Sequence, residues 1–277
     1  MTHHIAALLS HSESYSDALL NSRLALWEAY CPQVFFEYLD ALHLTAGSVI
    51  DIDHIHHTIL SQTGFTLSPA KDYLSPHDYL FELSQQRFPI ARHIRTMEND
   101  SFSPLPDLIH DLFCHVPWLL HQEFVKFFSS MGKLFIKAVE RAKAIYSIED
   151  QPRILNSNVL AISRCFWFTV ENGLIETQGK RKAYGAAILS STDQLSYTFN
   201  NNVFVSPFKT EHIIQRPCNP QSLQTTFFII RDFSELNDVA EKMHGFLEQG
   251  RLDFIVFGPH DVYYQDIIYF LNEHVFS

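Results

Sequence analysis

Cysteine, basic residues and long apolar runs are all scarce in this chain of 277 residues. The four cysteines are widely and irregularly spaced, which argues against a disulfide framework. Twenty Lys and Arg against 31 Asp and Glu give a formal net charge of −11, which argues against a nucleic-acid-binding surface. No apolar run approaches the length of a membrane span, and the first residues lack the basic region and the cleavage site of a secretory signal. We therefore expect a soluble, cytoplasmic protein that binds neither nucleic acid nor membrane.

Aromatic and aliphatic residues, in contrast, are abundant. Hydrophobic residues make up 46% of the chain and include 24 Phe and 11 Tyr, which is ample for a sizeable core. Apolar residues recur mostly at helical spacing, and no internal repeat or long linker divides the chain. The pattern predicts a fold that is mainly α with a small β component. We expect a loose segment over residues 1–16 and one domain over 17–277.

The expected elements follow from periodicity and from helix-breaking residues. Pro32 divides a helical stretch over 15–43, and Pro117 ends a short helix because proline disfavours helical geometry at the preceding residue. The same kinds of signal place the other elements. The further predicted helices cover 51–63, a segment opening at Ser75–Pro76, 107–115, 118–145, 156–173 and 234–250, residues 64–69 form a short connector, and the predicted strands cover 183–189, 225–230 and 252–257.

Two histidines and one glutamate carry the clearest chemical signal. His110 and His115 lie in a segment bounded by Pro106 and Pro117, and Glu171 follows in an otherwise apolar stretch. Two neutral imidazoles and one carboxylate form the facial triad of a non-haem Fe(II) oxygenase, which leaves the other coordination positions of the ion open. A carboxylate among aromatic residues is costly unless it is paired or bound to a cation. The three residues are therefore candidate metal ligands.

The histidine pair also has a simpler interpretation as two partly buried structural residues. Positions five apart lie about 140° apart around an ideal α-helix, so a straight helix would splay the two rings. We expect the helix to end near Pro117, which would let His115 turn toward His110. Two more conspicuous clusters are expected not to be ligand sets, namely His3–His4 on a loose terminus and Asp53–His57 on a surface helix.

Three segments together resemble the tetrahydropterin-dependent aromatic amino acid hydroxylases, which are the phenylalanine, tyrosine and tryptophan hydroxylases. They are Pro-Asp-x-x-His-x-x-x-x-His-Val-Pro from Pro106, Trp-Phe-Thr-Val-Glu-x-Gly-Leu from Trp167, and the stretch from Lys182 to Ser191 that begins Lys-Ala-Tyr-Gly-Ala. Weaker similarity runs from about residue 20 to about residue 260. The resemblance implies that 17–277 is the catalytic domain, and we expect no regulatory domain before it and no long tetramerisation tail after it.

The resemblance also implies a role for each matching residue. His110, His115 and Glu171 would hold Fe(II). Arg95 would receive the substrate carboxylate, and Asp107 would orient it, because a guanidinium can bind a carboxylate through two parallel hydrogen bonds. The remaining residues would be Ser103, Pro104, Trp167 and Ser190 on the substrate side, and Leu74, Tyr79 and Asp111 on the pterin side. This family has Trp at position 167 in its phenylalanine and tyrosine enzymes, which favours a phenylalanine-like substrate.

Five positions depart from the family pattern near the pterin and the iron. Asp111 stands in place of a glutamate that is one methylene longer, and Cys114 in place of a glycine, which adds a thiol beside a metal ligand. The other three are Phe166 in place of tyrosine, Asn172 in place of phenylalanine and Pro89 in place of histidine. We expect these substitutions to affect the cofactor preference.

The leading hypothesis is a monooxygenase that hydroxylates the ring of a free aromatic amino acid, phenylalanine first, with tyrosine or tryptophan as alternatives. It would use dioxygen, Fe(II) and a tetrahydropterin, either tetrahydrobiopterin or a bacterial-type relative. A second hypothesis, motivated by Cys114 and Asp111, is a degenerate homologue that binds metal or an aromatic ligand without turnover. A zinc hydrolase with the same three ligands is a third and less favoured hypothesis. The carboxyl end shows no coiled-coil heptads, and we expect a monomer or a small homo-oligomer.

Overall fold

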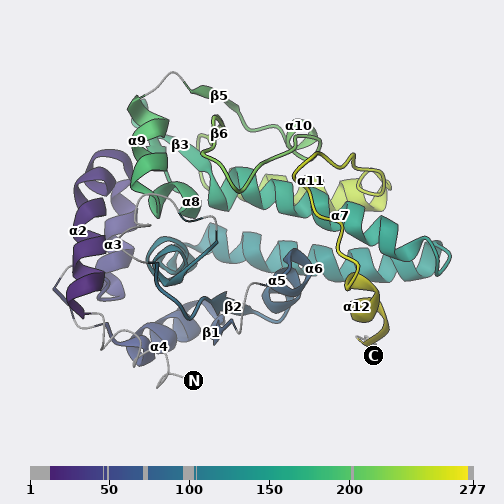
Figure 1. The fold of residues 1–277 in the computed structure, drawn as a ribbon, viewed down its shortest axis with the longest axis horizontal. Coiled ribbons are helices and arrows are strands. Elements are labelled where there is room, and N and C mark those ends of the chain that lie inside the picture. Colours follow the sequence, from purple (N-terminus) through teal and green to yellow (C-terminus); the bar gives the residue numbers. More distant parts are fainter. Residues whose placement is uncertain are drawn as a thin grey trace.

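Two long helices joined by a short turn form the centre of the molecule (Figure 1). The computed structural model describes residues 13–273, apart from 46, 49, 71–73, 96–102, 104 and 201–202. The central helices are α6 (Gln122–Ile145) and α7 (Gln151–Phe166), and α6 also packs against α5 (Pro76–Ser84) and α11 (Glu235–Glu248). Buried side chains recur along α6 every three or four residues, which is the spacing of one helix face.

The amino-terminal helices begin and end at residues whose types favour helix boundaries. Helices α2 (Glu13–Tyr30) and α3 (Gln33–Ala41) are separated at Pro32, as predicted. The side chain of Asp51 accepts a hydrogen bond from the backbone of α4 (Ile52–Thr63), and Gly64 ends that helix with a φ of 77°. Ser75 caps α5 in the same way, with Pro76 in the first turn. These sequence-based boundaries are confirmed.

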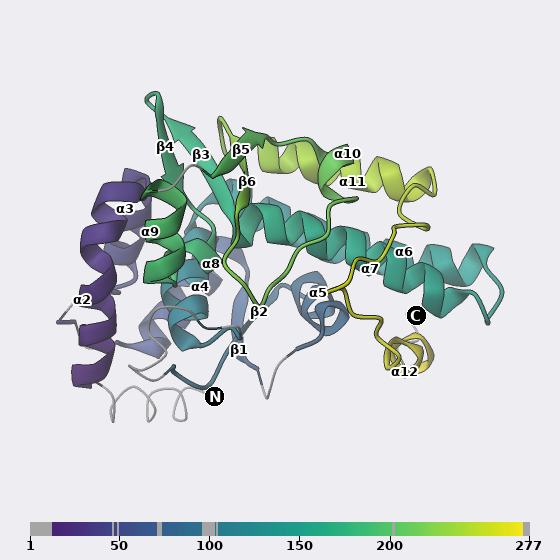
Figure 2. The same cartoon turned by 45° about the horizontal axis from the view of Figure 1, so that its top comes forward.

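A four-stranded mixed sheet, clearest in Figure 2, lies beside the central helices. Its order is β4 (Lys180–Ala183), β3 (Gly173–Thr177), β6 (Thr226–Ile230) and β5 (Phe204–Pro207), with β3 antiparallel to β4 and parallel to β6. A separate parallel pair joins β1 (Thr66–Pro69) to β2 (Arg87–Ile90). The short helices are α8 (Ala186–Leu189), α9 (Thr192–Asn200), α10 (Thr210–Ile213) and α12 (Ile267–Glu273). The prediction of a mainly α fold with a small β component is confirmed.

Several predicted elements are wrong, and tertiary contacts explain two of them. The predicted connector 64–69 contains β1, and the predicted strand 183–189 is mostly α8. Helix α7 begins five residues before the predicted cap at Asn156, because that side chain bonds the backbone of Tyr264 instead. The predicted strand 252–257 is absent from the described chain. The hydroxyl of Ser157 donates to the carbonyl oxygen of Leu252 and accepts the backbone N–H of Ile255, so these groups are not available to a neighbouring strand.

The buried apolar side chains fall into two clusters of different size. A large cluster extends from α2 to α12, and its aromatic members include Trp118, Phe124, Tyr184 and Phe233 in mutual ring contact. A small cluster consists of Phe168, Ile213 and Phe228, with Trp167, Phe208 and Cys218 packed against it. All four cysteines are free thiols, which agrees with the expectation from their spacing. None of the described helices is both long enough and apolar enough to cross a membrane.

Candidate metal centre and its cavity

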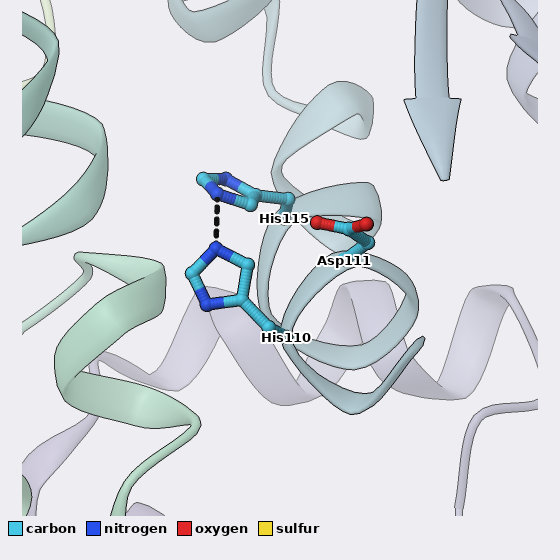
Figure 3. Close-up of side chains that lie close together, drawn as sticks. All are labelled: His110, Asp111 and His115. Atoms are coloured by element: carbon cyan, nitrogen blue, oxygen red, sulfur yellow. Dashed lines mark hydrogen bonds between the residues drawn. The ribbon is translucent and has the colours of Figure 1, made fainter. Parts of the chain in front are cut away.

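The two histidines meet because they lie on a π-helix. Residues Ile109–His115 form this helix, η2, and a 3-10 helix, η3 (Val116–Leu120), follows it directly. Hydrogen bonds in a π-helix join positions five apart, so such residues lie one above the other. The Nε2 atoms of His110 and His115 lie 3.0 Å apart, and Figure 3 shows these two nitrogens pointing toward each other from steeply inclined rings. The expected convergence is confirmed, but its cause is the wider helical turn and not a helix end at Pro117.

Glu171 reaches the same point from a second π-helical turn. This turn, η4 (Trp167–Glu171), continues α7. One carboxylate oxygen of Glu171 lies 3.1 Å from Nε2 of His115, and the other lies 3.3 Å from Nε2 of His110. Gly185 packs directly against this turn, since a Cβ atom there would lie 2.4 Å from the Glu171 carbonyl oxygen. Only glycine fits this close approach.

The separations between these donor atoms fit a bound metal ion. Ligand atoms about 2.1 Å from an ion and at right angles around it lie about 3.0 Å apart. The three measured separations are close to that value, and the side chains of His110 and His115 are largely buried. Two imidazoles and a carboxylate are also the donor types that suit a divalent iron centre. The residues present therefore fit the predicted ion.

Electrostatics within this cluster favour a negative carboxylate. Burial alone would raise the pKa of Glu171, but the charges and hydrogen bonds of His115 and His110 hold this pKa well below its usual range. Burial alone would lower the pKa of His110, but the charge and hydrogen bond of Glu171, together with the charges of Asp111 and Asp107, raise it. The cluster therefore attracts positive charge, which a divalent cation can supply in place of a proton.

Asp111 is a second carboxylate near the histidines. One of its oxygens lies within 4.8 Å of a nitrogen of each ring, and Figure 3 shows the group beside His115. The Asp111 carboxylate accepts the backbone N–H of Ala91 at 2.7 Å, and burial raises its pKa. Glu171, which contacts both imidazoles directly, is therefore the better third ligand, and Asp111 remains beside the site.

A buried ion pair stands at the start of η2. Nε and Nη2 of Arg95 donate to the two carboxylate oxygens of Asp107 at 2.9 and 2.7 Å. Although burial alone would raise the pKa of Asp107, the hydrogen bonds and charge of Arg95 lower it. Asp107 also accepts the backbone N–H of His110 at 3.1 Å, so the pair is tied to a metal-site residue. The predicted contact between Arg95 and Asp107 is present.

Ser190 connects this ion pair to the histidines. Its hydroxyl lies 3.2 Å from Nδ1 of His110, and its carbonyl oxygen accepts Nη1 of Arg95 at 2.8 Å. Arg23, which the sequence analysis missed, donates to the same carbonyl through Nε and Nη2 at 3.1 and 2.8 Å. A sequence signal for it existed, since Arg23 stands among apolar residues on one face of α2, four positions before the buried Trp27.

A cavity of about 760 Å³ opens on the three candidate ligands. Nine of the predicted site residues line it, namely Leu74, Tyr79, Ser103, His110, Asp111, His115, Trp167, Glu171 and Ser190. Tyr79 stands edge-on to Phe88 and Phe166, which fixes its ring in the wall. Arg95 and Asp107 lie behind Ser190 and are not part of the lining. Pro104 lies outside the described residues.

The departures from the family pattern are accommodated in different ways. Cys114 is fully buried in the large apolar cluster and does not line the cavity, and burial raises the pKa of its thiol. Pro89 and Phe166 are part of the lining, and the side chain of Asn172 donates to the carbonyl oxygen of Trp167. The substitution that adds a thiol therefore points it into the core and away from the cavity.

Other lining residues escaped the sequence analysis. They include Arg92, Cys218 and the segment 260–262 with Tyr264 near the carboxyl end. The buried ion pair of Arg164 with Asp261, at 2.6 Å, fixes that segment against α7. No local pattern distinguishes such loop residues, because only the folded chain brings them to the cavity.

A mainly helical domain that brings two histidines and a glutamate together from two π-helical turns, in the wall of a cavity, is the arrangement of a candidate metal-dependent enzyme. The sequence profile of the biopterin-dependent aromatic amino acid hydroxylases matches residues 20–273. The chain belongs to this family, and the resemblance inferred from its sequence segments is confirmed.

Individual relatives cover the chain to different extents. A Chlamydia pneumoniae protein named "Probable aromatic amino acid hydroxylase" is 45% identical over 237 residues, which are 86% of this chain and 65% of that protein. The tryptophan 5-hydroxylase of Xenopus laevis is 30% identical over 76% of this chain and 41% of its own length. The phenylalanine-4-hydroxylase of Pseudomonas aeruginosa is 27% identical over 82% of this chain and 80% of its own length. The chain thus spans less than two thirds of the first two relatives.

Solved structures show the same fold. Phenylalanine hydroxylase from Chromobacterium violaceum bound to cobalt superposes with a TM-score of 0.75 at 25% identity, over 91% of this chain and 86% of that one. Phenylalanine hydroxylase from Legionella pneumophila gives a TM-score of 0.71 at 25% identity, over 85% of this chain and 95% of that one.

Proposed function

We propose that this protein is a non-haem Fe(II), tetrahydropterin-dependent monooxygenase that hydroxylates the ring of a free aromatic amino acid, with phenylalanine as the preferred substrate. The observation that carries the proposal is the convergence of His110, His115 and Glu171 in the wall of a cavity that Trp167 also lines. Membership of the family and the cobalt-bound phenylalanine hydroxylase from C. violaceum support it. Bound Fe(II) and a reduced pterin, tetrahydrobiopterin or a bacterial-type relative, would together activate dioxygen.

In this proposal the three ligands hold the metal, and their neighbours hold the ligands. The Ser190 hydroxyl at Nδ1 of His110 fixes the ring orientation and leaves Nε2 for the ion. The buried pair of Arg95 and Asp107 braces the start of η2 through the backbone of His110. We assign to Arg95 the substrate carboxylate, which it would meet at the edge of the cavity that Ser190 forms.

The remaining lining residues divide the cavity between substrate and pterin. Ser103 and Trp167 belong to the substrate side, with Pro104 as a predicted member, and Trp167 offers a flat apolar face to the substrate ring. Leu74, Tyr79 and Asp111 belong to the pterin side. Closing such an aromatic cavity around a substrate excludes water from the reacting groups. The predicted division into residues 1–16 and a catalytic domain over 17–277 is part of the proposal, as is a monomeric or small homo-oligomeric state.

The choice of metal tests this proposal against its two rivals. Protein purified without oxygen would be loaded with Fe(II) or with Zn(II), then supplied with phenylalanine and a tetrahydropterin in air. After subtraction of the pterin oxidised in a protein-free control, we expect tyrosine and oxidised pterin in equal amounts with Fe(II) and neither product with Zn(II). Hydrolytic activity in the zinc form would favour the hydrolase.

A second comparison tests the degenerate homologue. We expect Cys114→Gly with Asp111→Glu to change hydroxylation by only a few fold, since the Cys114 thiol does not line the cavity. An inactive iron-loaded parent that gains large activity from this double substitution would establish a degenerate homologue.

A further inference from the structure

Trp167 is held differently from the other aromatic residues of the cavity. Its ring lines the cavity and packs against the small cluster of Phe168, Ile213 and Phe228. Tyr79 and Phe166, in comparison, contact rings that belong to the large cluster. The small cluster contains only three fully buried apolar side chains among the described residues, so apolar packing alone restrains the Trp167 ring less tightly.

A hydrogen bond to Gln224 supplies further restraint. The indole N–H of Trp167 donates to Oε1 of Gln224 at 3.2 Å. Nε2 of Gln224 donates to the carbonyl oxygen of Thr226, the first residue of β6, at 2.6 Å. Because the amide nitrogen must face a carbonyl, the amide oxygen necessarily faces the indole. The side chain of Gln224 is therefore fixed by the sheet and presents one acceptor to Trp167.

Gln194 in turn fixes the backbone of Gln224. The backbone N–H of Gln224 donates to Oε1 of Gln194 at 2.6 Å, and Nε2 of Gln194 donates back to the Gln224 carbonyl oxygen at 3.1 Å. Gln194 is 3% exposed, and its own backbone N–H donates to the Ser191 hydroxyl at 3.0 Å. The next residue back, Ser190, contacts His110. A pair of glutamines thus links the wall that carries Trp167 to the segment beside the metal ligands.

We propose that Gln224, held by Gln194, is a positioning residue that fixes the Trp167 indole and thereby sets which aromatic ring the cavity accepts. The inference rests on the proposed function for the identity of the ligand, an aromatic amino acid. Small changes in the shape of a ring pocket change discrimination between similar substrates strongly. An indole free to tilt would widen that pocket and weaken the choice between a one-ring and a two-ring substrate.

The first test reads the hydrogen bond without any turnover. The chain has three tryptophans, so nitrogen-15 labelling of the zinc-loaded, diamagnetic protein gives three indole N–H signals, and Trp167→Phe identifies the one that matters. In Gln224→Met we expect the Trp167 signal to move and its N–H to exchange with solvent faster, while those of Trp27 and Trp118 stay in place. Gln224→Glu keeps an acceptor for the indole but loses the donor to the Thr226 carbonyl oxygen, so its Trp167 signal should lie between those of the parent protein and of Gln224→Met.

The control for these spectra is Gln221→Met. Gln221 lies in the same loop three positions earlier, is exposed, and bonds Asn219 only through its backbone N–H. This substitution should leave all three indole signals and all binding constants unchanged.

The second test measures selection of the ring. L-phenylalanine and L-tryptophan would be titrated into the same zinc-loaded proteins, with the Trp167 signal and calorimetry as readouts. We expect Gln224→Met to weaken phenylalanine binding by roughly three- to tenfold, as loss of one positioning hydrogen bond would do, and to weaken tryptophan binding less. Gln224→Glu, which keeps only the acceptor, should give an intermediate difference.

Three results would overturn the inference. They are an unmoved Trp167 signal in Gln224→Met, a moved signal with unchanged dissociation constants for both amino acids, and a Trp167 signal that neither amino acid perturbs in the parent protein. The reaction with labelled dioxygen separates this failure from failure of the proposed function. If labelled product forms and any of these three results is found, only the role of Gln224 is rejected. If the amino acids bind as expected but no labelled product forms, only the proposed hydroxylase function is rejected.

Discussion

The metal wall of the cavity (His110, His115 and Glu171) and its ring wall (Trp167 with Gln224) are built in opposite ways. The metal wall stands on two π-helical turns, of which η4 continues the central helix α7, and the backbone of η2 is held by the buried pair of Arg95 and Asp107. The ring wall rests on a three-residue apolar cluster and on glutamine amides reached from a loop. The metal wall is thus the more rigid part, where metal ligands must be held to a fraction of an ångström. The ring wall is the more adjustable part, where it would contact the part of the substrate that differs between aromatic amino acids.

Removal of a proposed metal ligand should have the largest effect. Glu171→Ala leaves two imidazoles without their shared anion, so we expect loss of bound iron and a fall in kcat on the order of a thousandfold or more, beyond the 10- to 100-fold typical of outer-shell changes. Iron content and hydroxylation rate measure it. Glu176→Ala, at an exposed position five residues later, is the control and should retain both. Full iron occupancy in Glu171→Ala would remove Glu171 from the metal wall.

Breaking the buried ion pair should have the next largest effect. Asp107→Asn leaves the guanidinium of Arg95 buried without its charge partner, which costs about 3 kcal/mol of unfolding free energy. We also expect kcat/KM to fall by roughly a hundredfold, which corresponds to a similar free energy. The reason is that Arg95, the proposed partner of the substrate carboxylate, and the start of η2 are both disturbed. Chemical denaturation and steady-state kinetics measure the two effects. The exposed pair of Asp150 with Arg153 is the matched control, and Asp150→Asn should change neither quantity measurably.

A change to the ring wall should alter selection and leave the metal in place. Trp167→Phe removes one ring and the hydrogen bond to Gln224, so we expect the ratio of kcat/KM for phenylalanine to that for tryptophan to fall by about tenfold. Competition between the two amino acids in one reaction measures this ratio directly. Iron content should match that of the parent protein. A loss of iron in Trp167→Phe would mean that the two walls are not independent.

The smallest expected effect concerns pH and His77, a buried residue of α5 whose ring contacts Tyr264. Burial lowers the pKa of His77, although Asp78 and Asp266 partly oppose this. Below the ordinary pKa of about 6.5, the unfolded chain binds a proton at this residue more readily than the folded protein does. The free energy of unfolding should therefore fall as pH drops below about 6.5, by less than about 1.4 kcal/mol per pH unit from this one group.

His77→Gln isolates that contribution. Denaturation curves between pH 7 and pH 5 should show a smaller slope of stability against pH in this variant than in the parent protein. Equal slopes would show that the pKa of His77 is the same in the folded and unfolded chain. Iron binding at pH 7 should be the same in both proteins, because His77 lies outside the metal wall.

The two walls also differ in how far the sequence could predict them. The candidate ligands, Asp107 and the six other predicted residues of the cavity lining lie in short segments whose residue types carry their chemistry, and the structure brings them together. The π-helix could not be predicted, because the sequence pattern of residues 107–115 is the same for an α-helix and for a π-helix. Only packing in the folded chain selects the wider π-helical turn. Gln224 and Gln194 carried no signal, since their roles depend on contacts between residues 30 positions apart.

Local signals also failed where tertiary contacts took over their residues. Asn156 and Ser157 have the residue types of a helix cap, but both are buried inside α7 and bond the loop that follows α11. The mostly hydrophobic segment 252–257 has the composition of a strand, but a side-chain hydroxyl binds its backbone. The cytoplasmic location and the ranges 1–16 and 17–277 stay predictions.

The most direct test of the account is one reaction with labelled dioxygen. The iron-loaded protein and a tetrahydropterin would be mixed with phenylalanine, tyrosine and tryptophan together, and the products read by mass spectrometry. The account predicts one oxygen atom from dioxygen in a hydroxylated amino acid, with most label in the product of phenylalanine. An absence of labelled product from protein with a full complement of iron, across several tetrahydropterins, would contradict it.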